Sequence, residues 1–220
     1  MAVSREPLRL GSKIVAVGRN YVAHALELKN AVPTVPLLFL KPVSSVVAEP
    51  GSIEVTPDVH VDEGFHHEVE LGVVIGKRAK RVAEADALDY VAGYCVALDM
   101  TARNVQAEAK KAGMPWMAAK CRDTWTPLGP FVPKEDVPDP EALRIWCKVD
   151  GDVRQDGRTE NMIFKIPYLL EYVSSMYTLE PGDIVLTGTP EGVGPVRPGQ
   201  VISAGIDGLT EMSFPIVEVE

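Results

Sequence analysis

Two glutamates separated by one residue are the first group in this 220-residue chain whose types and spacing suggest chemistry. Glu68 and Glu70 lie in the segment HHEVELGVVIG, residues 66–76, which alternates and then becomes wholly apolar, as a strand entering a core does. Residues two apart on a strand share a face, so the two carboxylates would lie side by side while Val69 and Leu71 face the core. Adjacent carboxylates repel unless a cation or solvent compensates them, and hard Mg²⁺ or Mn²⁺ prefers such oxygen ligands.

An isolated Glu-x-Glu pair is more often a solvated strand face than a metal site. Two features favour the metal: the glutamates lie in an apolar strand, where a free carboxylate is costly to bury, and a third carboxylate follows another apolar segment, residues 90–98. That third carboxylate, Asp99, has an alternative role as a helix N-cap, because residues 99–112 have helical character and end at Gly113. Spacing alone leaves both roles open.

Arg103 and Gln106 follow Asp99 by four and seven positions and would share one helix face with it. A guanidinium can bind the carboxylate of a metal-bound ligand, and an amide can bind another of its oxygens. An ordinary Asp–Arg pair beside a solvated glutamine is the alternative. Lys120 stands in the mixed segment AAKCRDT, where nothing local marks it for a function.

His24 and Glu27 are three residues apart on a short predicted helix within residues 19–28. The carboxylate could orient the imidazole as a general base that activates water, although surface pairs of this kind are common. The glycine-rich loop of residues 188–194 resembles an anion-binding loop, because its backbone N–H groups can turn inward. It lacks the Gly-Lys-Ser/Thr ending of a nucleotide-binding P-loop.

His66 and His67 directly precede the acidic pair, and as ligands they would indicate Zn²⁺ or Fe²⁺. We favour a role for them in supporting the site or the structure. Cys95, Cys121 and Cys147 lack the close grouping of zinc or redox motifs, so we expect reduced thiols, with Cys95 and Cys147 in the core.

Composition limits the class of protein. The net charge of −9 argues against nucleic-acid binding, and no apolar run approaches the ~20 residues that cross a bilayer. Residues 1–12 have no secretory h-region and make a poor mitochondrial presequence, so we expect a cytoplasmic protein, with the mitochondrial matrix as the alternative if the chain is eukaryotic.

Scattered glycines and prolines, 18 of each, indicate many short elements joined by turns. Strands outnumber helices without regular alternation, so we predict the α+β class rather than a doubly wound sheet. The predicted strands are residues 14–17, 37–40, 66–76, 90–98, 144–149, 153–155 and 183–187, with two more at the end of the chain. The predicted helices lie within residues 19–28, 99–112 and 167–175. We expect an N-terminal extension, residues 1–13, and one domain, residues 14–220.

Seven ordered motifs give the chain a strong resemblance to the fumarylacetoacetate hydrolase family. They are VGRNYVAHALE, PLLFLKP, HHEVELGVVIG, VAGYCVALDMTARNVQ, AAKCRDTWTPLGP, RQDGRTENMIF and LEPGDIVLTGTPEGVGP, and they span nearly the whole sequence. HHEVELG and LDMTARNVQ most resemble the short acylpyruvase and oxaloacetate decarboxylase branch. The resemblance implies a mixed β-sandwich roll of the family's C-terminal domain type, with few short helices, and a homodimer.

The resemblance also assigns roles to residues. It implies that Mg²⁺ or Mn²⁺ is bound by Glu68, Glu70 and Asp99. It implies that the substrate is bound by Arg19, Arg103, Gln106, Gly188 and Thr189. It implies that the catalytic groups are His24, Glu27 and Lys120. One departure stands out: Cys121-Arg122 replaces a small or aromatic pair, and the added cation could change the preferred substrate tail.

The implied reaction is acylpyruvate hydrolysis that releases pyruvate, or oxaloacetate decarboxylation, both through a metal-bound pyruvate enolate. Water activated by His24 and Glu27 would attack an acylpyruvate, whereas decarboxylation needs no water. Hydration of a 2-oxo-4-enoic acid and oxaloacetate tautomerisation are alternative reactions of such a site. A non-catalytic dimer that binds an oxo acid is a further alternative, which the presence of His24, Glu27 and Lys120 argues against.

Overall fold

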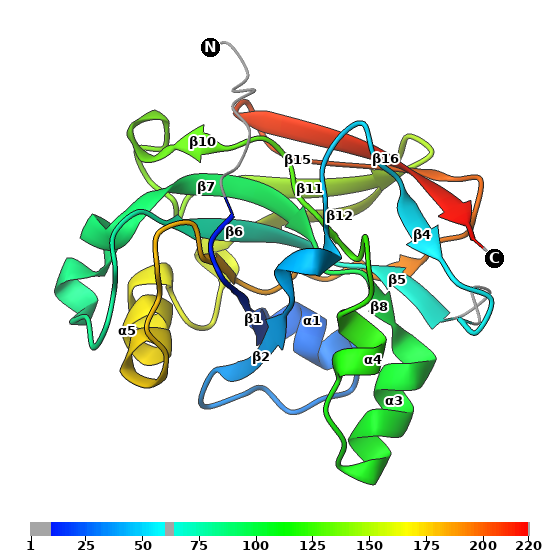
Figure 1. The fold of residues 1–220 in the computed structure, drawn as a ribbon, viewed down its shortest axis with the longest axis horizontal. Helices are drawn as coiled ribbons and strands as arrows, with labels where there is room; N and C mark the ends of the chain where they lie inside the picture. Colours follow the sequence, from blue (N-terminus) through cyan, green and yellow to red (C-terminus); the bar gives the residue numbers. More distant parts are fainter. Residues whose placement is uncertain (1–9, 60–63, 220) are drawn as a thin grey trace.

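Four β-sheets and a few short helices make up the part of the chain that the computed structural model describes, residues 10–59 and 64–219 (Figure 1). The α+β class is therefore confirmed. The strands are β1 Ile14–Gly18, β2 Leu37–Lys41, β3 Val46–Val47, β4 Ile53–Val55, β5 Phe65–His67, β6 Val69–Ile75, β7 Val91–Leu98, β8 Thr101–Ala102, β9 Thr126–Pro127, β10 Val132–Pro133, β11 Arg144–Val149, β12 Asp152–Arg158, β13 Ile184–Leu186, β14 Gly194–Pro195, β15 Val201–Ile206 and β16 Thr210–Glu218.

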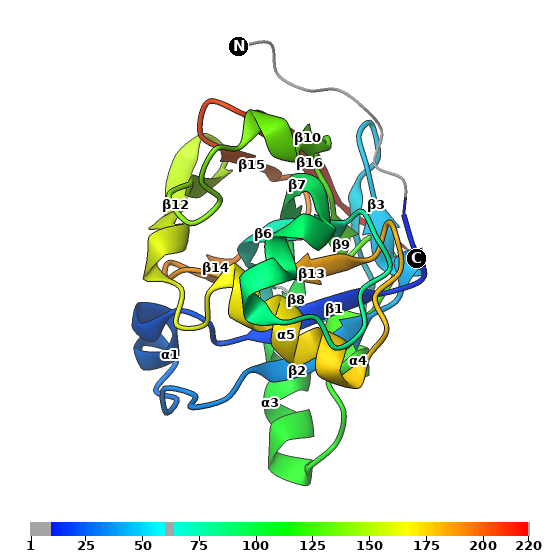
Figure 2. The same ribbon diagram turned by 90° about the vertical axis from the view of Figure 1, so that its left-hand side faces the viewer.

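The α-helices are α1 Val22–Glu27, α3 Arg103–Ala112, α4 Met117–Lys120 and α5 Ile166–Met176. The 3₁₀ helices are η1 Val43–Ser45, η2 Glu84–Tyr90, η3 Lys134–Asp136 and η4 Thr159–Asn161. Figures 1 and 2 place α1, α3 and α4 on one side of the central strands, and β15 and β16 on the other. No helix in the described ranges is long and apolar enough to cross a membrane.

The two largest sheets face each other across the main core. The six-stranded sheet has the order β10-β7-β6-β13-β1-β2, and the five-stranded sheet has the order β12-β11-β15-β16-β4. Alternate residues of β6, from Val69 to Ile75, enter the core between them, as a strand's two-residue period requires. Val74 belongs to a smaller apolar cluster on the opposite face, so both faces of β6 are buried. Glu70 lies on that second face.

Two predicted elements differ from the structure near the acidic residues. The expected continuous strand of residues 66–76 is interrupted at Glu68, where β5 leaves to pair with β8 and β14 while β6 joins the central sheet. The helix expected from residue 99 begins only at Arg103, because residues 101–102 pair with β5 first. Both differences arise from pairing between distant segments.

Other local predictions are confirmed. The Asp150-Gly151 turn joins β11 and β12, with both residues at positive φ, as a type I′ hairpin turn requires. Gly113 ends α3 in the left-handed conformation at φ 66°. Cys95 and Cys147 are buried, and all three cysteines are free thiols. Most of the predicted N-terminal extension, residues 1–9, lies outside the described residues.

Candidate active site

Antiparallel pairing of β6 with β7 brings three carboxylates together. Val69 pairs with Leu98 and Glu70 with Ala97, and the N–H of Asp99 donates to the backbone oxygen of Glu68 at 2.9 Å. One side-chain oxygen from each of Glu68, Glu70 and Asp99 lies within 4.8 Å of the others. The three residues are only 5%, 2% and 0% exposed, which rules out the solvated strand face considered above.

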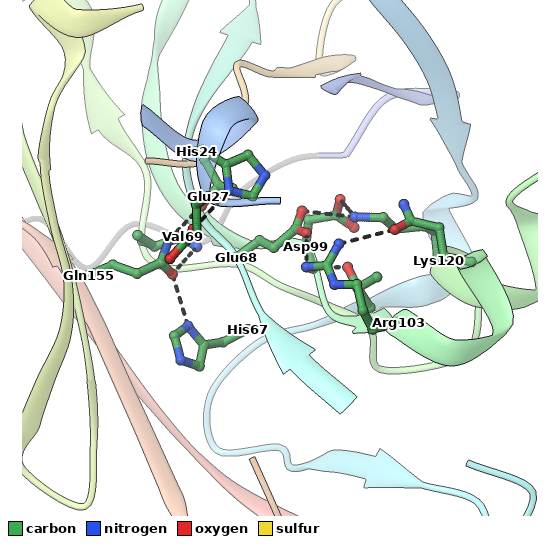
Figure 3. Close-up of polar contacts among 12 residues, drawn as sticks. His24, Glu27, His67, Glu68, Val69, Asp99, Arg103, Lys120 and Gln155 are labelled. Atoms are coloured by element: carbon green, nitrogen blue, oxygen red, sulfur yellow. Dashed lines mark hydrogen bonds and ion pairs between the residues drawn. The ribbon is translucent and has the colours of Figure 1, made fainter. Parts of the chain in front are cut away.

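Three cations compensate two of these carboxylates, and Figure 3 labels two of the three, Arg103 and Lys120. Glu68 accepts hydrogen bonds from Arg103 Nη2 at 2.5 Å and from Lys120 Nζ at 2.8 Å. Asp99 accepts from Lys120 Nζ at 2.5 Å through Oδ2 and from Lys41 Nζ at 2.6 Å through Oδ1. The two residues thus share the Lys120 ammonium, and each has a second cation of its own.

The electrostatics of this centre keep Lys120 charged. Burial alone would lower the pKa of Lys120, but the negative charges of Asp99 and Glu68 raise it above the ordinary value. Burial would raise the pKa of Glu68, but Lys120 and Arg103 lower it well below the ordinary value. The centre therefore holds a fixed ammonium between the side chains of Glu68 and Asp99.

Glu70 is the exception. Its one hydrogen bond among the described residues comes from the N–H of Gly188, at 2.7 Å to Oε2. Burial, followed by repulsion from Asp99 and Glu68, raises its pKa well above the ordinary value. A buried carboxylate without a counter-charge, beside two others and with oxygen as the only ligand atom, fits a hard divalent cation. The three acidic residues therefore fit Mg²⁺ or Mn²⁺.

One cavity collects most of the residues expected at the site. Its lining includes the three carboxylates and also Arg19, His24, Arg103, Gln106, Lys110, Trp116, Lys120 and Thr189. Arg103 Nη1 donates to Gln106 Oε1 at 3.1 Å, so these two act as one unit on α3. Glu27 and Gly188 do not line the cavity but contact residues that do, Glu27 through His24 and Gly188 through Glu70.

The histidine on α1 is buried and neutral. His24 Nδ1 lies 3.5 Å from Glu27 Oε2, an electrostatic contact longer than a hydrogen bond. Burial, the largest influence, lowers the pKa of His24, although Glu68 and Glu27 act in the opposite direction. The N–H of Gly192 donates to both carboxylate oxygens of Glu27, at 3.1 and 3.3 Å. The glycine-rich loop thus binds two of the protein's own carboxylates, those of Glu27 and Glu70.

Gln155 connects the acidic strand to the glycine-rich loop. Its Oε1 accepts from the N–H of Val69 at 3.0 Å, and its Nε2 donates to the backbone oxygen of Pro190 at 2.9 Å, which assigns both ends of the amide. Oε1 also contacts His67 Nδ1 at 2.9 Å, and Nε2 donates to the hydroxyl of Thr189 at 2.8 Å. Because Thr189 Oγ1 accepts there, its own proton remains available to another acceptor.

Sequence reasoning missed Gln155, Lys41 and Lys110. Gln155 lies on a hairpin strand that reads as solvent-exposed, and only the fold buries it. Lys41 is the residue of these three that the sequence could have indicated. It ends an apolar strand, and a lysine buried there must have hydrogen-bond acceptors. Its ammonium also donates to the backbone oxygens of Lys120 and Trp125, at 2.5 and 3.1 Å.

The structure excludes two alternative roles considered for Asp99 and Arg103, and one expectation, about Arg122, is wrong. Asp99 does not cap the helix, because Ala102 occupies the N-cap position. Arg103 pairs with Glu68 rather than with Asp99, which lies before β8 and off the helix. Arg122 does not line the cavity; its guanidinium pairs with Asp58 at 2.7 Å, so it adds no cation near the substrate.

The histidines before the acidic pair lie outside the carboxylate cluster. Among the described residues, the only group of acidic, histidine or cysteine side chains close enough to hold a metal is Glu68, Glu70 and Asp99. His67 is buried and bonds Gln155, which agrees with the supporting role that we favoured over metal binding.

The fold and the centre define a class: a mixed β-sandwich domain with a buried cluster of three carboxylates at one end of its central strands. The description "Fumarylacetoacetate (FAA) hydrolase C-terminal" matches residues 13–217. This chain belongs to the fumarylacetoacetate hydrolase family.

Individual relatives agree. The chain is 57% identical over 206 residues to "Oxaloacetate tautomerase FAHD1, mitochondrial" of Arabidopsis thaliana, covering 94% of this chain and 91% of that protein. It is 52% identical over 223 residues to the human protein of the same name, covering both completely. A crystal structure of fumarylpyruvate hydrolase from Pseudomonas aeruginosa with Mn²⁺ and pyruvate superposes with a TM-score of 0.87, at 36% identity, covering 97% of this chain and 91% of that one.

Proposed function

We propose that this protein is a Mg²⁺- or Mn²⁺-dependent enzyme of oxaloacetate and related 2-oxo acids, with oxaloacetate keto–enol tautomerisation as its main reaction. The observation that carries the proposal is the buried carboxylate cluster, in which no cation of the described residues pairs directly with Glu70. The relatives named oxaloacetate tautomerase, at 52% and 57% identity, support the substrate. They favour tautomerisation as the main reaction over hydrolysis and decarboxylation, the two reactions that the family resemblance implied.

Glu68, Glu70 and Asp99 would hold the cation. When bound, it supplies Lewis acidity toward the 2-oxo and carboxylate oxygens of the substrate. The Pseudomonas relative, whose structure contains Mn²⁺ and pyruvate, supports both the metal and the kind of ligand.

Residues from several elements would bind the substrate. The Arg103 guanidinium and the Gln106 amide bind its carboxylate and an adjacent oxygen, because both line the cavity beside Glu68. Thr189 has a hydroxyl proton to donate, and Arg19 supplies a further cation from the end of β1. Gly188, expected to bind the substrate, acts indirectly in this proposal, because its N–H holds Glu70 in place.

The proton transfer falls to His24 and Lys120. His24 is neutral because burial lowers its pKa, so it can accept a proton from C3 of oxaloacetate at neutral pH. The Lys120 ammonium stabilises the negative charge that then develops on the 2-oxo oxygen. Return of the proton to that oxygen completes the enol and restores His24. Glu27, held by Gly192, orients the imidazole.

Hydrolysis of acylpyruvates is the second candidate, and the His24–Glu27 pair favours it. The same base can activate water for attack on a distal carbonyl, with release of pyruvate. Decarboxylation of oxaloacetate would use the same stabilised negative charge without water. Hydration of 2-oxo-4-enoic acids ranks below these because the relatives cited above are named for tautomerisation and hydrolysis, and a non-catalytic dimer does not account for a neutral base beside a charged lysine.

One experiment separates these reactions. Wild-type protein with Mn²⁺ is given the enol form of oxaloacetate, acetylpyruvate or fumarylpyruvate; loss of the enol absorbance and formation of pyruvate are followed together. We expect the enol to decay faster than pyruvate appears from oxaloacetate. Pyruvate formation that matches enol decay would replace tautomerisation with decarboxylation, and no turnover of any substrate would contradict the enzymatic proposal.

We propose a homodimer as the assembly. An open apolar groove of the described surface, lined by residues 37–42, residues 114–117 and Cys121, supports it. Leu40, Met114 and Met117 are exposed beside the groove. In a two-fold contact the same surface of each copy faces the other, so the exposed side chains of one copy can fill the groove of its partner. Sedimentation analysis of wild type and Met117→Glu tests this: the wild type should be a dimer and the variant mostly a monomer.

The cellular location is a proposal as well. The relatives from Arabidopsis thaliana and human carry "mitochondrial" in their names, which favours the matrix over the cytoplasm for a eukaryotic chain. Fractionation of cells that make the tagged full chain distinguishes the two compartments.

A further inference from the structure

The cavity carries more positive charge than the proposed chemistry uses, because Lys110 has no role in that chemistry. Arg19, Arg103, Lys110 and Lys120 line the same cavity as Glu68, Glu70 and Asp99, so four cationic side chains face three carboxylates. A divalent cation at the carboxylates would increase the positive excess further. A cavity with such an excess favours a ligand with more than one negative charge.

Lys110 is the outermost of these cations. It lies seven residues after Arg103 and four after Gln106, and all three share one face of α3 and line the cavity. Helical side chains lean toward the N-terminus of their helix, which directs Lys110 back toward Gln106 and the carboxylate centre. Two helical turns thus present a guanidinium, an amide and an ammonium in order along one helix face, beginning with Arg103 beside Glu68.

No anionic partner of Lys110 is found in the described ranges. Its Nζ lies 5.3 Å from the centroid of the Trp116 ring, a contact that places the ammonium without neutralising it. Partial burial and repulsion from Arg19, Arg103 and Lys120 lower the pKa of Lys110 to about 8. Three like charges therefore act on the ammonium, and an incoming anion would relieve this repulsion.

Arg19 brings a second cation to the cavity from another element. Its backbone has φ 60°, a conformation that a non-glycine residue keeps only where its surroundings impose it. The next residue imposes it: buried Asn20 donates to the backbone oxygens of Phe164 and Thr187, at 3.0 and 2.8 Å, and accepts from the N–H of Phe164 at 2.8 Å. Arg19 also lacks an acidic partner in the part of the chain that the structure describes.

We propose that Lys110, with Arg19, binds the distal carboxylate of the substrate and makes the enzyme selective for dicarboxylic 2-oxo acids over acylpyruvates with an uncharged tail. The inference rests on the proposed function, because it takes the 2-oxo acid end to be bound at the carboxylate centre. Oxaloacetate and fumarylpyruvate carry the second carboxylate, whereas acetylpyruvate does not.

The test uses two unreactive probes that differ only at the distal group. 2-Oxoglutarate ends in a carboxylate and 2-oxopentanoate ends in a methyl group on the same carbon chain. Calorimetric titration of the Mn²⁺-loaded enzyme should show a preference for 2-oxoglutarate of about tenfold, the effect expected of one charge-assisted hydrogen bond. Lys110→Met should reduce that preference to about twofold or less, and Lys110→Arg should restore it.

Lys111→Met is the matched control. It removes the same charge from the next position of α3, which is exposed and does not line the cavity, and it should keep the wild-type preference. Because the readout is a ratio of two affinities, a variant that is merely damaged loses both affinities together. An unchanged ratio in Lys110→Met would overturn the inference and leave the proposed function intact, whereas failure of both probes to bind wild type would reject the proposed function itself.

Discussion

The two ends of β13 hold buried carboxylates in opposite circumstances. Asp183, just before the strand, accepts five hydrogen bonds: from the N–H and hydroxyl of Ser12, from the N–H and ammonium of Lys13, and from the N–H of Glu180. Beyond the other end, the N–H of Gly188 gives Glu70 a single bond. Burial opposes ionisation at both, yet the pKa of Asp183 is lowered by its donors and that of Glu70 is raised.

This difference separates a carboxylate that the fold itself satisfies from one that fits the proposed metal site. Donors within the chain satisfy the Asp183 carboxylate, and their hydrogen bonds hold residues 12–13 at the start of β13. The Glu70 carboxylate receives one hydrogen bond and lies beside two more carboxylates and a lysine. Buried charge alone therefore does not identify a site; the number of internal donors that each charge receives does.

The largest effect should come from Glu70→Gln. We expect Mn²⁺ affinity to fall by more than about a hundredfold and turnover to be lost with it. The metal-free protein should be as stable as wild type or more so, because a neutral amide replaces a carboxylate that has no counter-charge. Calorimetry with Mn²⁺ and thermal melts in EDTA measure the two effects. Unchanged Mn²⁺ affinity would contradict the assignment of the site.

His24→Ala separates the carboxylate centre from the base. Tautomerisation and acylpyruvate hydrolysis should fall by about 10²–10⁴-fold, because both need a proton acceptor. Decarboxylation of oxaloacetate should fall far less, since it needs neither a base nor an attacking water. Glu27→Gln, which changes only the group that orients the imidazole, should have a smaller effect. Equal losses in all three reactions of His24→Ala would contradict the role of His24.

Asp183→Asn tests the structural end of β13. We expect a loss of about 2–4 kcal/mol in the free energy of unfolding, because the Lys13 ammonium loses its partner and several buried donors lose an acceptor. The folded fraction should keep its kcat/KM and its Mn²⁺ affinity. Urea denaturation and steady-state kinetics on the same preparation check both parts, and a loss of metal binding would mean that the two ends of β13 are not independent.

The Gln155 side chain is an uncharged buried group whose amide oxygen and nitrogen both have hydrogen-bond partners, as the Asp183 carboxylate does. Gln155→Met removes the donor that fixes the Thr189 hydroxyl, and we expect kcat/KM to fall by about tenfold, the value of one hydrogen bond. Thr189→Val should cost a similar amount, and the double variant should cost little more than either single one. Additive losses would show that Gln155 acts on the enzyme by another route.

The pH dependence of stability should have opposite signs for the two carboxyls. The lowered pKa of Asp183 stabilises the fold above its ordinary pKa of 3.8, and this contribution is lost as pH falls through the native-state pKa. The raised pKa of Glu70 means that the native state keeps a proton that the unfolded chain releases, so stability falls as pH rises above 4.5.

Urea melts in EDTA measure these slopes, which are at most about 1.4 kcal/mol per pH unit for one proton. Glu70→Gln should flatten the decline above pH 4.5, and Asp183→Asn should weaken the acid limb. Identical pH profiles in both variants and wild type would show that neither carboxyl controls the pH dependence.

Local patterns were sufficient for most of the fold. Runs of apolar residues located β1, β2 and β7, and the Asp150-Gly151 turn located a hairpin. The break at Glu68 was not predictable, because it depends on β8 and β14 pairing with β5 from distant parts of the chain. The same pairing delays the helix to Arg103 and removes Asp99 from it.

The acidic residues of the site followed from chemistry and from the family motifs, whereas their partners did not. Lys41 lies 58 positions from Asp99, and Gln155 lies 34 positions from Thr189, so no spacing rule joins them. Lys110 reads as one of two solvated lysines on α3, and only the position of the cavity distinguishes it from Lys111. The prediction that Arg122 adds a cation near the substrate failed for the same reason, because the guanidinium pairs with Asp58, 64 positions away in the sequence.

The position of Lys41 has a consequence for how the protein opens. It is the last residue of β2, which lies at the edge of its sheet, yet its ammonium is buried against Asp99. Edge strands usually fray at little cost and exchange their amide hydrogens early. Here fraying of β2 would withdraw a charge from the centre of the enzyme, so amide exchange along residues 37–41 should slow when ligand binds there.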